Sequence, residues 1–435
     1  MKTIIEKANK YLKEAIKEIT QMPAEMVKTR STAFTRKRKL PFEKTIRIIL
    51  SMQSGTINKA LLSKFHFSQQ TPTNSAFVQS RAKIQINVFP MLLKKFLSKI
   101  DAKQLFKGYR LLATDGSEML IPTNPNEAAY HVPATSKSSS YNLLHLNVIY
   151  DVLNRLFMDA EIQPLREMNE HKALIHMVDA LPVENAIVTA DRGYESYNAI
   201  AHLESKGYKY VFRVKSNNGI CHGLRLPNSA EYDQTFSYQL TKKKTSVAKQ
   251  RHDLYRILSN KTTFDYLDAS HPYYPISFRV VRIKISDNIY ETLITNLDRA
   301  DFPPETLKHI YHLRWGVETA FRSAKYSIGM ICFHSKKAAF IEQEIFAHLI
   351  MYNFSLMITS SVAIQKVKND KRKLNYQINL DIAIYLCLNF FCNSQQTPSE
   401  TESLIRSYLV PIRPNRSFPR KRKSTRAVSF NYRLN

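Results

Sequence analysis

The stretch from Tyr311 to Lys325, YHLRWGVETAFRSAK, constrains the fold of this chain more than any other stretch. At the pitch of an α-helix, about 100° per residue, its apolar and polar side chains separate onto opposite sides. The apolar side holds Leu313, Val317, Ala320 and Ala324, and the polar side holds Tyr311, Arg314, Trp315, Glu318, Arg322 and Lys325. A solvated face more often alternates charge signs in i,i+4 pairs. One carboxylate among cations suits a metal ion and a polyanion bound together. The alternative is a surface helix in which Glu318 pairs with Arg314 and Arg322.

Four of these residues have a specific spacing, Tyr311-x2-Arg314-x3-Glu318-x6-Lys325. This spacing resembles the signature of the insertion-sequence-four family of DDE transposases. Other segments resemble blocks of the same family, and they read STAFTRKRKLPF, TDGSEMLIP, TADRGYESY and ETLITNL. The resemblance extends from about residue 31 to residue 355. It implies a ribonuclease-H-like catalytic domain that is interrupted by a β-rich insertion.

Three carboxylates distant in sequence form the candidate catalytic set. Asp115 follows the apolar run 111–114 and Asp191 follows the apolar run 186–190, so we expect both at the carboxyl ends of strands, where open α/β sheets place their sites. By resemblance, Asp115, Asp191 and Glu318 are the ligands of two Mg²⁺ or Mn²⁺ ions. Such ions prefer carboxylate oxygens and activate both oxygens of a phosphodiester transfer. The alternatives are a hairpin turn at Asp115-Gly116 and a loop closed by Asp191.

The cations near these acids are candidate phosphate ligands. By the same resemblance, Tyr311, Arg314 and Lys325 hold phosphates near the cleaved strand. We also expect phosphate contacts from Arg322 and from residues that follow strand ends, namely Arg192, Arg213 and Lys215.

The formal net charge of +28 points to a polyanionic partner, and nucleic acid is the first candidate. A membrane surface is the second, but no polybasic amphipathic anchor is evident. The four cysteines form no CxxC pair, which favours reduced thiols in a cytosolic protein. The sequence contains nine glycines and no GxGxxG or Walker loop, which argues against nucleotide-driven chemistry.

The sequence favours a cytoplasmic, nucleoid-associated prokaryotic protein. Its first residues lack the apolar core of a signal peptide. The apolar stretches 345–363 and 376–392 are interrupted by polar residues, so we interpret them as core helices rather than membrane spans.

The predicted organisation has five regions. A helical DNA-binding region spans 1–105, where a helix-turn-helix and a plain helical bundle with a basic rim are both open. The catalytic domain occupies 106–216 and 291–360, around a β-rich insertion at 217–290. A helical C-terminal region with a basic tail, 413–435, spans 361–435.

The pattern within 107–216 predicts three strands, a helix, a strand, a helix and a strand, which is the order of a ribonuclease-H-like domain. The expected elements include strands 143–150, 156–162, 186–190 and 208–214, a helix at 172–181 and a second helix capped by Ser196. In the insertion, the apolar phase changes at Val281, which predicts a β-bulge there.

The leading hypothesis is a cut-and-paste transposase that binds terminal inverted repeats, cleaves DNA and joins 3′ ends to target DNA. The alternatives are a metal-dependent nuclease on the same fold and a non-catalytic DNA-binding protein from a decayed element. We expect a homodimer on double-stranded DNA, because two ends must be paired. Some relatives hold a flipped base with a tryptophan of the insertion, whereas the only tryptophan here is Trp315. A hairpin intermediate is therefore left open, with Tyr266, Tyr273 or Tyr274 as stacking candidates.

Overall fold

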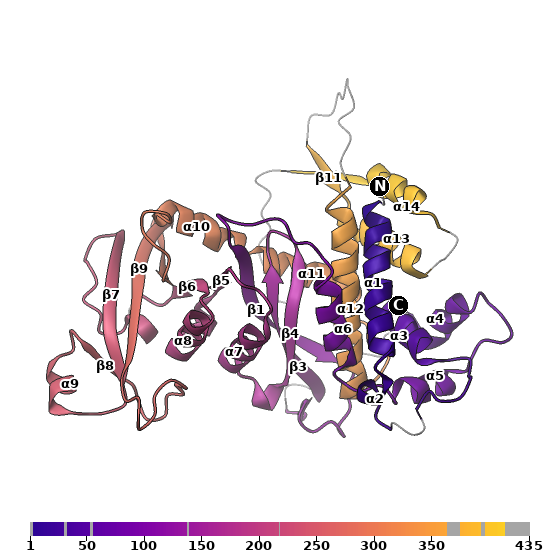
Figure 1. Ribbon diagram of the computed structural model, residues 1–435, viewed down its shortest axis with the longest axis horizontal. Coiled ribbons are helices and arrows are strands. Elements are labelled where there is room, and N and C mark those ends of the chain that lie inside the picture. The colour runs from indigo at the N-terminus through magenta and orange to yellow at the C-terminus, as the bar shows by residue number, and fades with distance from the viewer. Residues whose placement is uncertain are drawn as a thin grey trace.

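The computed structural model describes residues 3–29, 33–52, 55–136, 139–216, 218–362, 375–392 and 396–413. Figure 1 shows a sheet in the middle of the molecule, the strands of the insertion at one end and a helical bundle around α12 at the other. The predicted basic tail lies outside the described residues except for Arg413, which is exposed.

The central sheet is mixed, and the order of its first strands is ribonuclease-H-like. These strands are β1 (Arg110–Ile121), β3 (Tyr141–Asp151), β4 (Leu156–Pro164), β5 (Ala186–Ala190) and β6 (Lys209–Val214). In space they follow the order β4-β3-β1-β5-β6. β3 is antiparallel to β1 and β4, whereas β5 is parallel to β1 and β6 is parallel to β5. The short β2 (His131–Val132) pairs with β3. The predicted α/β fold class is therefore confirmed.

Helices cover both faces of this sheet. On one face, Leu112 and Val188 pack with residues of α7 (Glu170–Ala180) and α8 (Tyr197–Ser205). On the other face, Leu111 and Ile187 pack with residues of α10 (Pro304–Leu313), which is followed by α11 (Gly316–Tyr326). Successive side chains of a strand point to opposite faces, so β1 and β5 are apolar at consecutive positions because both faces of the sheet are covered. Ser196 is the N-cap residue of α8, as predicted, although its side chain makes no capping hydrogen bond. Three short 3₁₀ turns connect these elements: η1 (Leu165–Glu167), η2 (Arg192–Tyr194) and η3 (Gly219–Cys221).

The insertion extends the same sheet. It contains β7 (Tyr232–Thr241), α9 (Ser246–Gln250), β8 (Tyr255–Ile257) and β9 (Tyr274–Ser286), and β10 (Ile289–Thr295) joins β9 to β6. The predicted bulge at Val281 is wrong, because β9 pairs with β10 in regular register through Val280 and Val281. The apolar phase changes there because both faces of β9 are covered, Val280 in one core cluster and Val281 in another. The register shift falls instead between Ile289 and Tyr290.

The N-terminal helices form a bundle with the central helix α12 (Ala338–Thr359). They are α1 (Ile4–Thr20), α2 (Pro23–Met26), α3 (Phe42–Ser51), α4 (Ile57–Lys64), α5 (Asn74–Arg81) and α6 (Val88–Leu97). Among them, α1, α3 and α6 pack directly against α12. α12 is buried around its whole circumference, which is typical of a core helix. Its Asn353 exchanges two hydrogen bonds of 2.8 Å with the backbone of Phe157 and so joins α12 to strand β4.

The C-terminal elements complete the bundle. α13 (Leu380–Cys392) packs against α12, and α14 (Pro398–Ser407) packs against α13. β11 (Tyr376–Ile378) and β12 (Leu409–Pro411) form a separate two-stranded sheet. Among the helices that the structure describes, none combines the length and apolarity needed to cross a membrane.

Candidate active site

The register between β1 and β5 places Asp115 and Asp191 at the same level on two adjacent segments of the chain. The parallel pairing places Ala113 opposite Thr189, two residues before each aspartate. The backbones of paired strands are about 4.8 Å apart. Leu111 and Ile187 lie four residues before the two aspartates, and both pack against α10. Since side chains two or four residues apart in a strand point to the same face, both carboxylates project toward the face that α10 and α11 cover.

Asp115 is not at the end of its strand, which corrects the expectation from the sequence. β1 continues to Ile121 because β3 remains its antiparallel partner after β5 has ended. The carboxylate therefore projects from the middle of β1. The hairpin alternative at Asp115-Gly116 is wrong for the same reason. Asp191 does close a loop, since its Oδ1 accepts a hydrogen bond of 2.8 Å from the backbone N of Gly193.

The single helix predicted over 311–325 is in fact two helices. α10 ends at Leu313 and α11 begins at Gly316, with a tight turn between them in which the backbone N of Arg314 donates to the carbonyl of Tyr311 at 3.2 Å. Gly316 lets this turn approach the β3–β4 connection, since a Cβ at this position would lie 3.0 Å from Cγ1 of Val152. Arg314 and Trp315 keep right-handed helical dihedral angles, so the turn tightens the chain locally in a segment whose pattern is helical throughout. The predicted apolar side is present, because Val317, Ala320 and Ala324 are buried.

Glu318 approaches the two aspartates from α11 and is paired with Arg314. Nη2 of Arg314 lies 3.1 Å from Oε1 of Glu318, and the side chain of Arg314 is only 5% exposed. This is the ion pair that the surface-helix alternative expects, but here its arginine is buried against the sheet. Arg322, the other expected partner of Glu318, is exposed.

The electrostatics of Asp115 show that the three carboxylates interact. Burial raises the pKa of Asp115 to about 6, the cation of Arg314 opposes this shift, and the negative charges of Asp191 and Glu318 add to it.

The donor chemistry of this set fits a hard divalent cation. Within the described ranges, no group of three or more His, Cys, Asp or Glu side chains is placed closely enough to hold a metal ion as it stands. The set nevertheless consists of carboxylates, which Mg²⁺ and Mn²⁺ prefer, and a divalent cation would favour the ionised form of Asp115, which burial disfavours. Asp115, Asp191 and Glu318 are the residues that would hold it.

Lys325 of α11 contacts β1 two to three residues after Asp115. Its Nζ donates to Oγ of Ser117 at 2.7 Å and to the carbonyl of Glu118 at 3.2 Å. Burial lowers the pKa of Lys325, and the charge of Asp115 counteracts part of this effect. The lysine is thus a partly buried cation next to the carboxylates.

Tyr311 belongs to a second buried group of donors. Its ring centroid lies 5.4 Å from the guanidinium carbon of Arg314, and the phenol lies close enough to Arg213 for that cation to lower its pKa against the dominant effect of burial. The Nε atoms of Arg314 and Arg213 are buried and have no hydrogen-bond partner among the described residues. Such spare donors suit an anionic ligand.

The remaining predicted cations lie apart from this group. Arg192 and Lys215 are both exposed beside Glu195, past the ends of β5 and β6. The backbone N of Lys215 donates to Oε2 of Glu195 at 3.3 Å. Asp115 thus lies within electrostatic range of Asp191, Glu318, Arg314 and Lys325, and Tyr311 lies against Arg314, while Arg192, Lys215 and Arg322 are exposed.

Sequence reasoning missed two residues that lie next to this site. Glu170, the first residue of α7, and His145 on β3 pack against Gly116, and Glu170 also packs against Gly193. The available signal was the glycine that follows each candidate aspartate within two residues.

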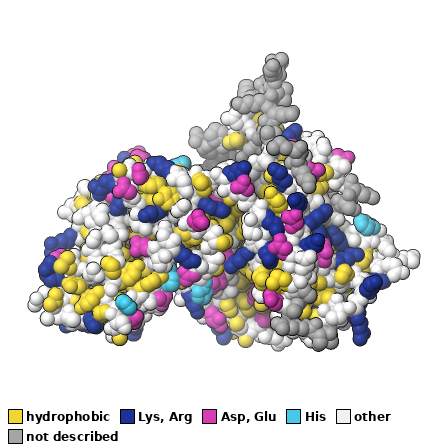
Figure 2. Space-filling view, in the orientation of Figure 1, with side chains coloured by type: hydrophobic (Ala, Val, Ile, Leu, Met, Phe, Trp, Pro, Cys, Tyr) yellow, Lys and Arg dark blue, Asp and Glu magenta, His cyan; other side chains and the backbone are white. Residues whose placement is uncertain are grey.

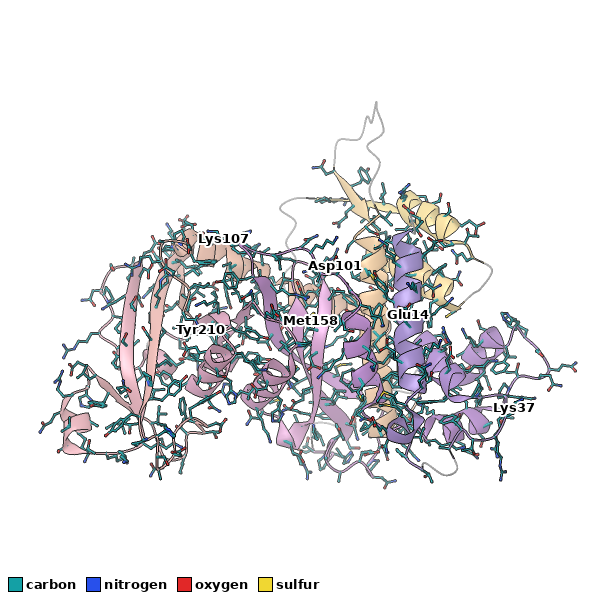
Figure 3. The ribbon with its side chains drawn as sticks, in the orientation of Figure 1. Glu14, Lys37, Asp101, Lys107, Met158 and Tyr210 are labelled. Carbon is teal, nitrogen blue, oxygen red and sulfur yellow. The ribbon has the colours of Figure 1, made fainter. Side chains whose placement is uncertain are left out.

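A basic groove lies in the N-terminal region, in a place where the sequence predicts a basic rim. It has a volume of about 1150 Å³ and runs between the loop 34–40 and the start of α5. Its cations are Arg36, Lys37, Arg38, Lys39 and Lys83, and no acidic residue is among its described lining residues. Lys37 lies at the outer edge of the helices, where Figures 2 and 3 show Lys and Arg side chains directed outward.

Comparison with known proteins gives one family match. The family model described as "Transposase DDE domain" matches residues 106–354. No curated protein matches significantly. Among solved structures, the chain is similar to the piggyBac transposase in a cryo-EM structure of its synaptic complex with hairpin DNA. That likeness has 13% sequence identity and a TM-score of 0.39, and it covers 94% of this chain and 84% of that chain. The fold assignment here rests on the strand order.

Proposed function

The chain belongs to the transposase DDE domain family, whose model spans more than half of it, and we propose that it is a cut-and-paste DNA transposase. In this proposal, it binds the terminal inverted repeats of its element, cleaves the DNA and joins the 3′ ends to target DNA. The observation that supports the proposal is that Asp191 and Glu318, from distant segments of the chain, both lie near enough to Asp115 to raise its pKa.

Asp115, Asp191 and Glu318 would hold two divalent ions, Mg²⁺ or Mn²⁺. When bound, such ions activate the attacking oxygen and stabilise the leaving oxygen of a phosphodiester transfer. The burial of Asp115 supports this role, because a low-dielectric setting strengthens its attraction for a cation.

Arg314, Tyr311 and Lys325 would hold the phosphate being cut. Arg314 pairs with Glu318 through Nη2 and keeps a buried Nε free for an anion. Arrival of a phosphate and a divalent ion would let the guanidinium move to the phosphate and release the carboxylate of Glu318. Lys325 already lies beside Ser117 on the strand of Asp115, so its ammonium is placed for the same phosphodiester.

The basic groove of the N-terminal helices would bind the DNA backbone of the transposon end. Its cations lie on the loop 34–40 and, in the case of Lys83, just after α5, without an acidic neighbour in the described lining. This suits phosphates and carries no base specificity by itself. Two ends must be paired for joining, so we propose a homodimer on DNA.

The test uses linear DNA that carries the element's ends, with Mg²⁺ or Mn²⁺. Asp191→Asn and Glu318→Gln should each abolish cleavage, because each removes a metal ligand, while binding to end DNA should change little. Undiminished cleavage by either variant would refute the proposed mechanism. Supplying pre-cleaved ends with a target plasmid separates a transposase from a nuclease on the same fold, since only a transposase makes joined product.

A non-catalytic DNA-binding protein is the second candidate. The ion pair of Arg314 with Glu318, at 3.1 Å, favours it, because that pair satisfies the glutamate without a metal. Absence of Mn²⁺ binding by the folded protein, together with retained DNA binding, would support this candidate.

A further inference from the structure

A carboxylate lies behind the two aspartates, on the face of the sheet that α7 covers. Glu170 begins α7, and its side chain is 30% exposed. A Cβ added at Gly116 would lie 2.6 Å from Oε1 of Glu170, and a Cβ added at Gly193 would lie 2.9 Å from Oε2. One carboxylate therefore contacts two separate segments, one on β1 and one after β5.

Each of these two glycines is tied to a candidate metal ligand. The backbone N of Gly116 donates to Oδ1 of Asp115 at 3.0 Å. The backbone N of Gly193 donates to Oδ1 of Asp191 at 2.8 Å. A displacement of either glycine therefore moves the carboxylate beside it.

His145 holds Glu170 in this place. The histidine is 4% exposed, and its Nε2 lies 3.1 Å from Oε1 of Glu170, an ion-pair distance although the angle does not suit a hydrogen bond. The proximity of His145 keeps the pKa of Glu170 below its usual range, against the effect of burial. A Cβ at Gly116 would also collide with the imidazole, so no larger residue fits at that position without displacing the pair.

Glu170 contacts the sheet from the side opposite to the aspartates. Asp115 and Asp191 share the phase of residues that pack against α10, whereas Gly116 has the opposite phase and meets Glu170. Tyr194 lies near Glu170, Asp115 and Asp191. Burial raises the pKa of its phenol, and the charges of these three acids add to the shift.

We propose that Glu170, held by His145, is a positioning residue that fills the space between the two glycine segments and thereby sets the separation of Asp115 and Asp191. The role depends on the proposed function, because it concerns the geometry of the same metal-binding carboxylates. Its shape is what matters, since the carboxylate lies on the face of the sheet opposite to the aspartates.

The experiment measures Mn²⁺ affinity of the full-length protein by electron paramagnetic resonance, alongside DNA cleavage. Glu170→Ala should weaken Mn²⁺ binding by about 10- to 100-fold, as loss of a group that orients metal ligands does. Glu170→Gln keeps the shape and should retain affinity close to that of the unaltered protein. The matched control is Asp179→Ala at the other end of α7, where Asp179 pairs with His202 at 3.2 Å, and it should leave Mn²⁺ binding unchanged.

A second pair of variants tests the contact independently of folding losses in Glu170→Ala. Gly193→Ala adds a methyl group 2.9 Å from Oε2 of Glu170 and 3.2 Å from Oδ1 of Asp191, and it should weaken Mn²⁺ binding. In Gly193→Ala/Glu170→Ala, the methyl group occupies space that the glutamate has left, so the combined loss should be smaller than the product of the two single losses. Strictly multiplicative losses would overturn the proposal.

Other outcomes separate this inference from the proposed function. If the unaltered protein binds Mn²⁺ and cleaves DNA but Glu170→Ala binds Mn²⁺ equally well, the positioning role is wrong and the proposed function stands. If Glu170→Gln is as weak as Glu170→Ala, the charge rather than the shape is required, which also overturns the role. If the folded, unaltered protein neither binds Mn²⁺ nor cleaves end DNA, both proposals fail.

Discussion

Replacing Arg81 tests how the N-terminal region is joined to the rest of the chain. Arg81 is the last residue of α5, and its guanidinium is 1% exposed. It donates from Nη1 to Glu344 at 2.8 Å, from Nε to Gln343 at 3.0 Å and from Nη2 to the carbonyl of Phe340 at 2.6 Å. All three acceptors belong to α12.

The cost of Arg81→Met comes mainly from the carboxylate it leaves behind. Burial opposes ionisation of Glu344, but Arg81 and His334 outweigh it and bring its pKa to about 2, so the group is charged at neutral pH. The backbone N of His334 still donates to its Oε2 at 2.9 Å, but the main counter-charge is gone. Removing one partner of a buried ion pair costs about 3–5 kcal/mol of unfolding free energy.

The assay is urea unfolding at neutral pH. Arg81→Met/Glu344→Gln should recover a large part of the loss, because the double variant no longer buries an unpaired charge. The matched control is Arg47→Met, which breaks the exposed pair of Arg47 with Glu43 at 2.8 Å and should cost less than about 1 kcal/mol. A loss below about 1 kcal/mol for Arg81→Met, or an equal loss in the Glu344→Gln background, would refute this reasoning.

Three further predictions concern the core and the groove. Asn353→Leu should cost about 2–4 kcal/mol of unfolding free energy, because it orphans the buried backbone N and O of Phe157; a cost near zero in urea unfolding would contradict the contact. Burial lowers the pKa of His348 from its usual 6.5 to about 4, so the unfolded chain takes up a proton at higher pH than the folded chain. Its stability contribution is therefore complete above about pH 6.5 and is lost as the pH falls toward 4; urea midpoints should drop between about pH 7.5 and about pH 5, and His348→Asn should remove part of that drop. Lys37→Ala/Arg38→Ala should reduce the slope of log Kd for end DNA against log salt by about 1.8, and an unchanged slope would exclude the groove as a phosphate site.

Much of the sheet could be predicted because its signals are local. The run Ala186–Ala190 is apolar at every position except Thr189, and its ends coincide with those of β5. The course of β1 past Asp115 could not be predicted, because the antiparallel partner that sustains it comes from a distant segment. The false bulge at Val281 has a similar cause, since a strand covered on both faces loses its alternation without changing its hydrogen bonding.

For the candidate site, the spacing of the signature predicts Glu318, Arg314 and Lys325, and the structure places Arg314 beside Glu318 and Lys325 beside the strand of Asp115. The spacing was not enough to show the tight turn at Arg314 and Trp315, after which Gly316 lies close to Val152 from another part of the chain. Glu170 belongs to no sequence motif. What distinguishes it from other acidic residues at helix starts is its contact with Gly116, which only the structure shows.

The burial of α12 on every side has a consequence for the distance along the DNA between the bound end sequence and the cleaved bond. Through Glu344 this helix binds Arg81 beside the basic groove, and through Asn353 it binds β4 at the edge of the sheet. In the proposed function, the groove and the carboxylates are therefore connected through one buried helix. The length of duplex between the bound end sequence and the cut would then be dictated by protein geometry. A single inserted base pair, which shifts the phosphate by about 3.4 Å, would carry the scissile bond out of reach.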